Sequence, residues 1–167
     1  MSERKLFFDT VDTPKGEFII TFNETGIYEV LFPGRTLAEI VDTAKLPWSN
    51  LEDDFKRYFS GEAVEWTEYP LDCSGYGRFT TALLKEVSKI PWGQTCSYRE
   101  AAELAGSPLA WRAAGQALAA NRHPIIVPCH RVIGSNRKLG GFSGPAGWKE
   151  MLLELEGGFN GALSFRR

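Results

Sequence analysis

The pattern that most constrains the fold is a pair of short helices between residues 97 and 120. The run Ser97-Tyr98-Arg99-Glu100 is a capping box, in which serine and glutamate side chains bond the first backbone N–H groups of a helix. Gly106 ends this helix, and Ser107-Pro108 supplies the N-cap and first position of the next, which runs from Leu109 to about Ala120. Two helices joined by a three-residue turn with glycine predict a helix-turn-helix, although many such hairpins bind nothing.

The second helix of this pair is rich in small residues. Its apolar stripe is Trp111, Ala114 and Leu118, which we expect to be buried. Its other faces carry two long polar side chains, Arg112 and Gln116, whereas a reader of base sequence needs several. This composition predicts a close approach to a duplex, mainly through phosphate contacts and with little sequence discrimination. Tight packing against another helix is the alternative.

A cysteine lies within the apolar stretch Ile125–Ile133. Three branched apolar residues lead into Pro-Cys-His-Arg, and the chain then returns to apolar residues, which predicts a short buried strand or run. Burial alone would make Cys129 a poor nucleophile, because apolar surroundings raise the pKa of a thiol. The adjacent His130 is a candidate base for forming the thiolate. The alternative is that Cys129 is a small buried apolar side chain.

A basic glycine-rich loop and a final helix follow the cysteine. The loop, residues 134–145, lacks the spacing of a phosphate-binding loop but could place backbone N–H groups against a ligand, with Phe142 as an apolar wall. The helix should stop at Gly157 and bury one face made of Trp148, Met151, Leu152 and Leu155. Glu154 and Glu156 lie in its last turn, where the helix dipole disfavours anions. Such a glutamate either has a tertiary partner or is tolerated in solvent.

The first 72 residues predict a scaffold that mixes strands and helices. Helical spacing predicts one helix from near Thr36 and a second, opened by a capping box of Ser49 and Glu52, that runs to Gly61. Short runs rich in Phe, Ile, Val and Tyr predict four strands: Lys5–Asp9, Glu17–Phe22, Ile27–Phe32 and Val64–Tyr69. The sequence of this half contains no cluster typical of catalysis.

Charge divides the chain into two parts. Residues 1–73 contain 7 Lys/Arg and 15 Asp/Glu, whereas residues 74–149 contain 10 Lys/Arg and 3 Asp/Glu. We therefore predict an acidic scaffold domain over residues 1–72, a linker over 73–77 and a basic domain over 78–167 that can meet a polyanion. A chance distribution of solvated charges is the alternative.

The cysteines and histidines argue against a disulfide framework and against a metal site. Cys73, Cys96 and Cys129 are scattered and odd in number, and no pair has the spacing of metal ligands. Free thiols favour a reducing intracellular compartment. No apolar run approaches the length of a membrane span, and no signal segment is expected.

Together these residues resemble the O6-alkylguanine-DNA alkyltransferases, also called methylated-DNA–protein-cysteine methyltransferases. The resemblance covers most of residues 77–157, and a Pro-Cys-His-Arg-Val core with these flanks is highly specific. It is carried by residues 90–98, 112–115, 121, 125–133, 140–144 and 149–157. The resemblance implies an α+β fold. A small antiparallel sheet with a helix, ribonuclease H-like, would precede a helix-turn-helix domain, winged-helix-like, that carries the active-site cysteine.

The resemblance also implies roles for five catalytic residues. Cys129 would take the alkyl group, His130 would deprotonate it through a water, and Glu156 would orient the imidazole. Asn121 would brace the cysteine segment. Tyr98 would donate to the guanine ring and help to turn its phosphate.

Other residues are implied to meet DNA and the extruded base. Arg112 would enter the duplex and fill the gap left by the flipped nucleotide, and the other DNA contacts would be Ser97, Ala113, Gly115, Gln116 and Arg122. The base pocket would contain Trp92, Val132, Phe142, Ser143 and Gly144. Phe142 and Trp92 both depart from the residue that many members carry, which would alter the tolerance for bulky alkyl groups.

The implied function is direct-reversal DNA repair. The alkyl group of O6-alkylguanine in double-stranded DNA would pass once and irreversibly to Cys129, with O4-alkylthymine left open as a second substrate. No cofactor or metal is expected. The protein would be a monomer, and whether it binds DNA cooperatively is left open. Its location would be the cytoplasm, or the nucleus in a eukaryote. A lesion-binding relative without repair activity would have tryptophan in place of Cys129, and a cysteine hydrolase would need an oxyanion site.

Overall fold

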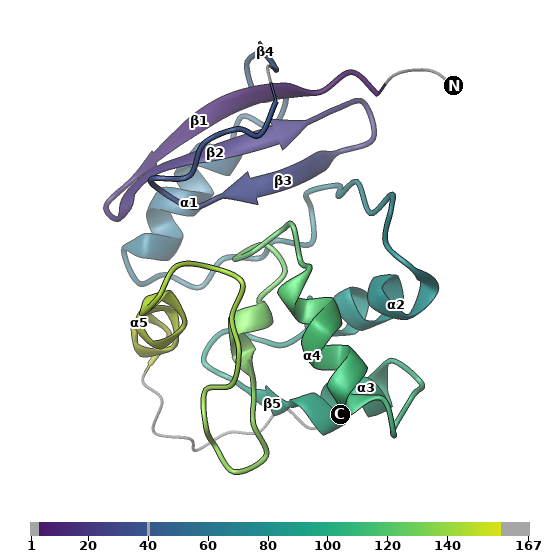
Figure 1. Cartoon of the computed structure of the whole chain (residues 1–167). Coiled ribbons are helices and arrows are strands. Elements are labelled where there is room, and N and C mark those ends of the chain that lie inside the picture. The colour runs from purple at the N-terminus through teal and green to yellow at the C-terminus, as the bar shows by residue number, and fades with distance from the viewer. Residues whose placement is uncertain (1–3, 40, 158–167) are drawn as a thin grey trace. The chain divides into compact units, whose positions relative to one another are not determined.

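The structure, a computed structural model, describes residues 4–39 and 41–157. The chain divides into two compact units, residues 1–74 and 75–167. Helices and strands occur together, and the predicted α+β class is confirmed (Figure 1). In the part of the chain that the structure describes, no helix has both the length and the apolar character that a bilayer crossing requires.

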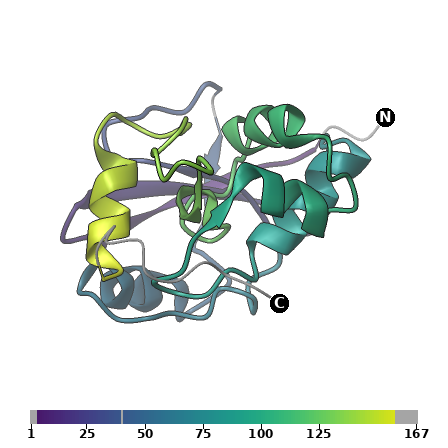
Figure 2. The ribbon, with the colours of Figure 1, turned by 90° about the horizontal axis from the view of Figure 1, so that it is seen from below.

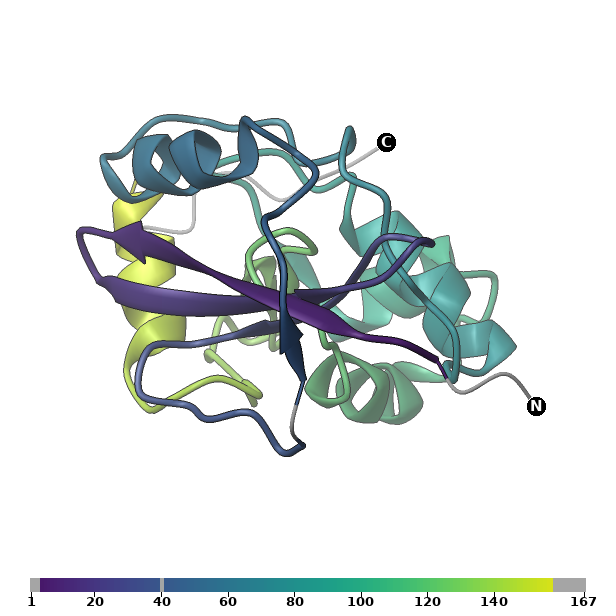
Figure 3. The same ribbon diagram turned by 90° about the horizontal axis from the view of Figure 1, so that it is seen from above.

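The first unit is a small sheet with one helix packed on it. Strands β1 (Phe7–Thr13), β2 (Gly16–Phe22) and β3 (Ile27–Leu31) form an antiparallel meander, and β4 (Asp42–Thr43) pairs in parallel with β1 (Figure 3). Helix α1 (Leu51–Phe59) buries its apolar stripe against the sheet. The ring of Phe18 on β2 lies 5.4 Å from that of Phe55 on α1. The first three predicted strands are confirmed, with ends shifted by up to four residues.

Three local predictions in this unit are wrong. No helix forms from Thr36; the chain instead runs along β1, where the Ala44 backbone N–H donates to the Phe8 carbonyl oxygen at 3.0 Å. The expected strand over 64–69 is a series of turns that carries the buried Trp66. Helix α1 has Asn50 as its N-cap with no side-chain cap bond, so the Ser49 capping box is absent. In each case tertiary packing outweighed a weak local preference.

Gly26 occupies a position that admits no side chain. Its φ is +154°, and a Cβ atom there would lie 2.3 Å from the Pro70 carbonyl oxygen, which accepts from the Ile27 N–H at 2.9 Å. We expect Gly26→Ala to lower the free energy of unfolding by about 1–3 kcal/mol, since both backbone strain and a backbone clash result. Chemical denaturation should show this loss. Gly34→Ala is the matched control, with φ +82° and open space around its Cβ position; an equal loss there would contradict the steric account.

The second unit gathers helices around the cysteine segment. Helices α2 (Arg78–Val87), α3 (Tyr98–Leu104) and α4 (Trp111–Ala119) pack on one another, and α5 (Trp148–Leu155) lies on the other side of the segment (Figure 2). That segment contains the 3-10 turn η1 (Cys129–Arg131), which both α2 and α5 contact. Strand β6 (Val132–Ile133) follows and pairs in parallel with β5 (Cys96–Ser97).

The helix pair α3 and α4 is confirmed, with a longer connection than the sequence predicted. The capping box is present: the Ser97 hydroxyl accepts from the Glu100 N–H at 3.1 Å, and Glu100 accepts from the Ser97 N–H at 2.7 Å. Gly106, with φ +81°, ends α3 as expected. Ser107 caps no helix; its carbonyl accepts from the Ala110 N–H at 2.9 Å in an extra turn, so the connection spans residues 105–110.

The buried stripes of α4 and α5 differ from the predicted ones. On α4 the buried residues are Ala114, Ala117 and Leu118, whereas Trp111 is 44 % exposed. On α5 they are Lys149, Leu152, Leu153 and Glu156, the last being the C-cap residue. The buried residues of α5 have regular helical spacing, but the first and the last of them are charged. The sequence prediction followed apolar residues only and therefore chose the neighbouring face of the helix.

Candidate active site

Cys129 is held in a tight buried turn. The turn starts at Ile125, whose φ of +73° reverses the chain, and closes with the Cys129 N–H donating to the Val127 carbonyl at 2.7 Å. Asn121 crosses this turn: its amide donates to the Val127 carbonyl at 3.2 Å and accepts from the His123 N–H at 2.9 Å. The stretch Ile125–Ile133, predicted as a short buried strand or run, is a buried run in which Val132–Ile133 pairs as a strand.

Behind the cysteine lies a buried group of three charged or polar side chains. His130 Nε2 lies 2.8 Å from Glu156 Oε1, and Arg131 binds both oxygens of Glu156, from Nε at 2.8 Å and from Nη2 at 2.7 Å. Arg131 also donates through Nη1 to the Ile90 carbonyl at 2.5 Å. The guanidinium thus compensates for the placement of Glu156 at a helix C-terminus, where a lone carboxylate is disfavoured.

The electrostatics of this group favour a neutral histidine beside an ionised glutamate. Burial raises the pKa of Glu156, but the hydrogen bonds from His130 and Arg131 and the Arg131 charge outweigh burial and hold it at about 2. Burial lowers the pKa of His130, against the opposing pull of Glu156. An ionised carboxylate can only accept, so Nε2 of the neutral imidazole carries the proton and Nδ1 is the basic nitrogen. The imidazole is therefore in the form that can take a proton.

The thiol of Cys129 needs such a base. Burial raises the pKa of Cys129, while the Asn121 side chain, the nearby Lys149 charge and the backbone N–H groups of Cys129 and His130 oppose that rise. The thiol is accordingly protonated at rest, and the groups that oppose burial are those that stabilise a thiolate once it forms.

Lys149 is a buried cation that sequence reasoning did not assign. Its ammonium donates to the carbonyl oxygens of Val132 at 2.7 Å and of Gly141 at 3.0 Å, and lies 5.7 Å from the centroid of the Tyr98 ring. Burial lowers its pKa to about 8, with the Cys129 charge acting the other way. Lys149 therefore joins the cysteine turn to the glycine-rich loop.

A pocket of about 40 Å³ opens onto the cysteine. It is lined by Tyr98, Gly115, Leu118, Ala119, Cys129, Gly141, Phe142 and Ser143. The Tyr98 hydroxyl donates to the Gly141 carbonyl at 3.3 Å, and burial raises the phenol pKa, so this group remains a donor. Gly140 approaches the same ring so closely that a Cβ atom would lie 2.5 Å from the hydroxyl. A pocket of this size holds about one water molecule.

The structure brings part of the predicted site together. Cys129, Tyr98, Phe142, Ser143 and Gly115 line the pocket, and His130, Glu156 and Asn121 lie behind Cys129 as described above. Val132 is fully buried with its carbonyl accepting from Lys149, and neither it nor Trp92 nor Gly144 is among the residues lining this pocket. Arg112, Ala113 and Gln116 lie exposed on α4; Ser97 caps α3; and Arg122 stacks on Tyr76 at 4.2 Å.

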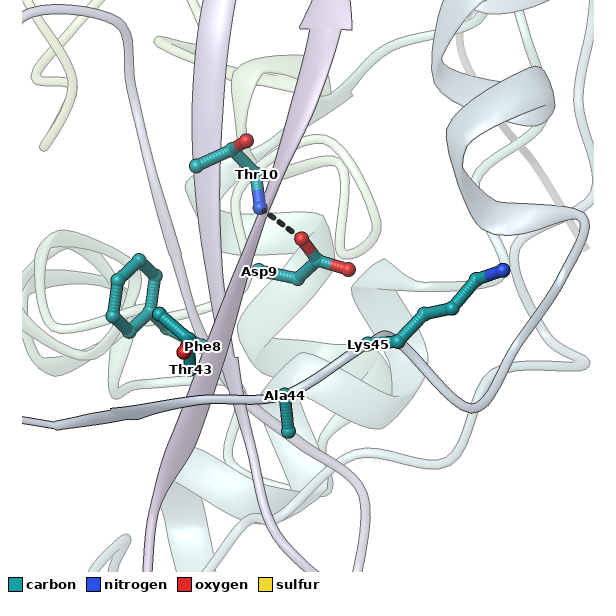
Figure 4. A pocket seen from close by; sticks show the side chains of 6 residues that line it. All are labelled: Phe8, Asp9, Thr10, Thr43, Ala44 and Lys45. Carbon is teal, nitrogen blue, oxygen red and sulfur yellow. Dashed lines mark hydrogen bonds between the residues drawn. The ribbon is translucent and has the colours of Figure 1, made fainter.

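A second hollow lies on the sheet of the first unit. It measures about 710 Å³ and is lined by Phe8, Asp9, Thr10, Thr43, Ala44 and Lys45 (Figure 4). Its carboxylate is engaged by the backbone, with Asp9 Oδ1 accepting from Thr10 N–H at 2.9 Å and Oδ2 from Leu46 N–H at 3.0 Å. It contains no pairing of base and nucleophile, so the cysteine pocket is the candidate active site.

The unit with this pocket is a helix-turn-helix that presents a buried cysteine backed by histidine and glutamate. A family model described as the 6-O-methylguanine DNA methyltransferase DNA-binding domain matches residues 78–158. A methylated-DNA–protein-cysteine methyltransferase of Methanosarcina barkeri is 36 % identical over 90 % of this chain and 97 % of its own length. One from Mycobacterium tuberculosis is 37 % identical over 90 % and 92 %.

A crystal structure of Mycobacterium tuberculosis OGT in complex with DNA has a TM-score of 0.80, at 35 % identity over 90 % of this chain and 92 % of that one. The O6-methylguanine-DNA methyltransferase of Pyrococcus kodakaraensis shares the fold at 20 % identity, with a TM-score of 0.69. The chain belongs to the methylated-DNA–protein-cysteine methyltransferase family. The family that the sequence resembles is thereby confirmed.

Proposed function

We propose that the protein repairs O6-alkylguanine in double-stranded DNA by transferring the alkyl group to Cys129. The observation that carries this proposal is the Cys129 thiol at a pocket wall, followed in the same turn by a neutral His130 that is bonded to an ionised Glu156. Nucleophile, base and orienting acid are the three parts that thiol alkylation needs. The names of the relatives cited above state methyl transfer from methylated DNA to a protein cysteine, which supports the proposal.

The reaction would proceed by displacement at the alkyl carbon. His130 Nδ1 takes the thiol proton through a water molecule, and the sulfur attacks the alkyl carbon. The S–C bond forms as the C–O6 bond breaks, and the electron pair stays on guanine, which Tyr98 stabilises by donating a hydrogen bond to the ring. The thioether has no easy route back to a thiol, so each molecule reacts once. No cofactor takes part.

The base must leave the duplex to reach Cys129. Extrusion costs a few kcal/mol, less for a damaged base that pairs weakly. Arg112 would fill the gap, and Ser97, Ala113, Gly115, Gln116 and Arg122 would contact the DNA. The carbonyls of Cys129 and Val132 and the Ser143 N–H would bind the guanine edge, with Trp92, Phe142 and Gly144 around it. The pocket volume of about 40 Å³ is far below the roughly 300 Å³ of a typical ligand site, so we expect the pocket to widen when a base enters.

Several wider features complete this proposal. The partner is alkylated duplex DNA, which the net positive charge of residues 74–149 suits. We place the protein inside the cell, in the cytoplasm or nucleus, as a monomer, with residues 1–72 as a scaffold domain, 73–77 as linker and 78–167 as the reactive domain. Activity on O4-alkylthymine and cooperative coating of DNA are extensions that the same experiments can address.

One mass measurement tests the function. Mixing the protein with an oligonucleotide duplex bearing O6-methylguanine should add a single methyl group, located on the peptide containing Cys129. Cys129→Ala should show no adduct, and Cys73→Ala should react like the native protein, because Cys73 lies outside the pocket. An adduct that persists in Cys129→Ala, or no adduct on the native chain, refutes the proposal.

A further inference from the structure

Two large apolar side chains stand out on the surface of the described residues, 4–39 and 41–157. Leu109, just before α4, is 93 % exposed, and Trp111, the first residue of α4, is 44 % exposed. Every other large apolar side chain in that part of the chain is buried or half-buried. Exposing an indole in water is unfavourable, because an aromatic ring has a large apolar area to bury. Two neighbouring exposed apolar side chains are a candidate contact surface, which the position and charges of α4 then specify.

The position of Trp111 relates this surface to the cysteine pocket. Trp111, Gly115 and Ala119 are spaced by four residues and so follow one row along α4. Gly115 and Ala119 both line the pocket of Cys129. Trp111 continues the same row one turn further toward the helix N-terminus, about 6 Å along the helix axis from Gly115. The exposed indole therefore lies on the pocket side of α4.

The charges around Trp111 favour an anionic partner with flat apolar faces. The Arg112 guanidinium lies 4.8 Å from the centroid of the Trp111 ring. Helix α4 contains no acidic residue, and its N-terminus adds a positive dipole end. A nucleic acid combines phosphate charge with base faces on which an aromatic ring can stack. An acidic protein surface would satisfy the charge but offers no comparable partner for the indole.

We propose that Trp111, with Leu109 beside it, is an apolar wedge that stacks on the base pair next to the extruded nucleotide. The inference rests on the proposed function and adds a second DNA-contacting element to it. Apolar side chains inserted at a base step unstack it and open the duplex, which lowers the cost of extruding the neighbouring base. Arg112, already placed against the indole, would enter the same gap, so the two side chains would act as one unit.

Fluorescence tests the stacking directly. In a Cys129→Ser background that blocks transfer, adding duplex with O6-methylguanine should quench tryptophan emission. Trp111→Phe should lose the share of that quenching that arises from stacking and keep only what Trp92 contributes, whereas Trp48→Phe, in the first unit, should retain all of it. Unchanged quenching in Trp111→Phe would overturn the inference. Because the phenyl ring of Trp111→Phe preserves an aromatic side chain at the surface, this result does not depend on a disruptive substitution.

Kinetics separate the wedge from the chemistry. Trp111→Ala should repair duplex O6-methylguanine between about fivefold and a hundredfold more slowly, the effect of losing one base–aromatic stack. Its reaction with free O6-benzylguanine base should stay within twofold of the native rate, since that substrate needs no extrusion. Equal slowing on both substrates, or normal repair of duplex, would overturn the inference. A native protein inert toward both substrates would refute the proposed function, and the wedge with it.

Self-association is the other use of an exposed apolar pair. Sedimentation of the native chain without DNA should show a monomer at every concentration tested. A concentration-dependent dimer that Trp111→Ala and Leu109→Ala both abolish would assign the pair to a protein interface and would overturn the inference.

Discussion

Replacing Arg131 with leucine should lower the free energy of unfolding by about 3–5 kcal/mol, the usual result of removing one partner of a buried ion pair. Arg131 is 4 % exposed and supplies two of the three hydrogen bonds from this group to Glu156. Without the guanidinium the carboxylate would remain buried at a helix C-terminus without its two Arg131 bonds, and the Ile90 carbonyl would lose the Arg131 donor. Urea unfolding would measure the loss.

Arg57 provides a matched control on the surface of α1. Its guanidinium also makes two bonds to carboxylate oxygens, to Asp54 at 3.0 Å and to Glu62 at 2.9 Å, but its side chain is 52 % exposed. We expect Arg57→Leu to lower the free energy of unfolding far less than Arg131→Leu does, because exposed ion pairs gain little over water. Similar losses in the two variants would mean that the buried group contributes no more than a surface pair.

The ion pair between Arg131 and Glu156 makes the free energy of unfolding depend on pH in acid. The pKa of Glu156 is about 2 in the folded protein, below its ordinary value of 4.5. Its contribution to stability is therefore complete above about pH 4.5 and is lost as the pH falls toward 2. Asp72, whose pKa is also about 2, adds a similar dependence in the first unit. Because Arg131→Leu leaves Asp72 untouched, the pH dependence of the difference between the two stability curves should reflect Glu156, and the difference should narrow as the pH falls toward 2.

Arg131 also shows what could be predicted from the sequence. The Cys-His pair, Asn121, Tyr98 and Glu156 were identified through the family resemblance, and short-range signals located the first three strands and the Ser97 capping box. An arginine within an apolar run is itself a signal, because charged residues are seldom buried unless they are paired. Its partner could not be chosen from the sequence, since Glu156 lies 25 residues away on another element.

The failures share one physical cause. The segment after Thr36 has helical apolar spacing, but its backbone forms hydrogen bonds with β1 instead of a helix. On α5 the buried face is not the predicted apolar one but the face that begins with Lys149 and ends with Glu156. Trp111 fits the α4 stripe by spacing, yet it lies at the helix start and remains exposed. Periodicity records which residues are apolar, whereas burial depends on what the fold places opposite them.

Lys149→Met should slow alkyl transfer at neutral pH by about tenfold or more. The lysine charge opposes the rise in the Cys129 pKa caused by burial, and a nearby opposite charge is typically worth about one to three pKa units. Each unit changes the thiolate fraction by about a factor of ten. Methionine keeps the length and apolar stem of the side chain while removing the charge and both hydrogen bonds. The reaction with free O6-benzylguanine is the proper measurement, because it excludes effects on DNA binding.

Two controls separate charge from position. Lys149→Arg keeps a cation near Cys129, so its rate should fall less than that of the methionine variant even if the bonds to Val132 and Gly141 are imperfect. Lys89→Met removes a lysine that is 39 % exposed and paired with Glu86 on the surface of the same unit, and should leave the rate unchanged. A slow Lys149→Arg variant together with a slow Lys149→Met variant would assign the residue a purely geometric role.

The pH profile decides between those roles. The folded pKa of Lys149 is about 8, below its ordinary 10.5, so the ammonium is charged below pH 8 and loses its proton above it. Its help to the thiolate is therefore complete at neutral pH and fades as the pH rises through 8. The ratio of native to Lys149→Met rates should accordingly be largest below pH 8 and narrow above it, because the native protein then loses the charge that the variant never had. A ratio that stays constant from pH 6 to 10 would show that the lysine acts through its hydrogen bonds and not through its charge.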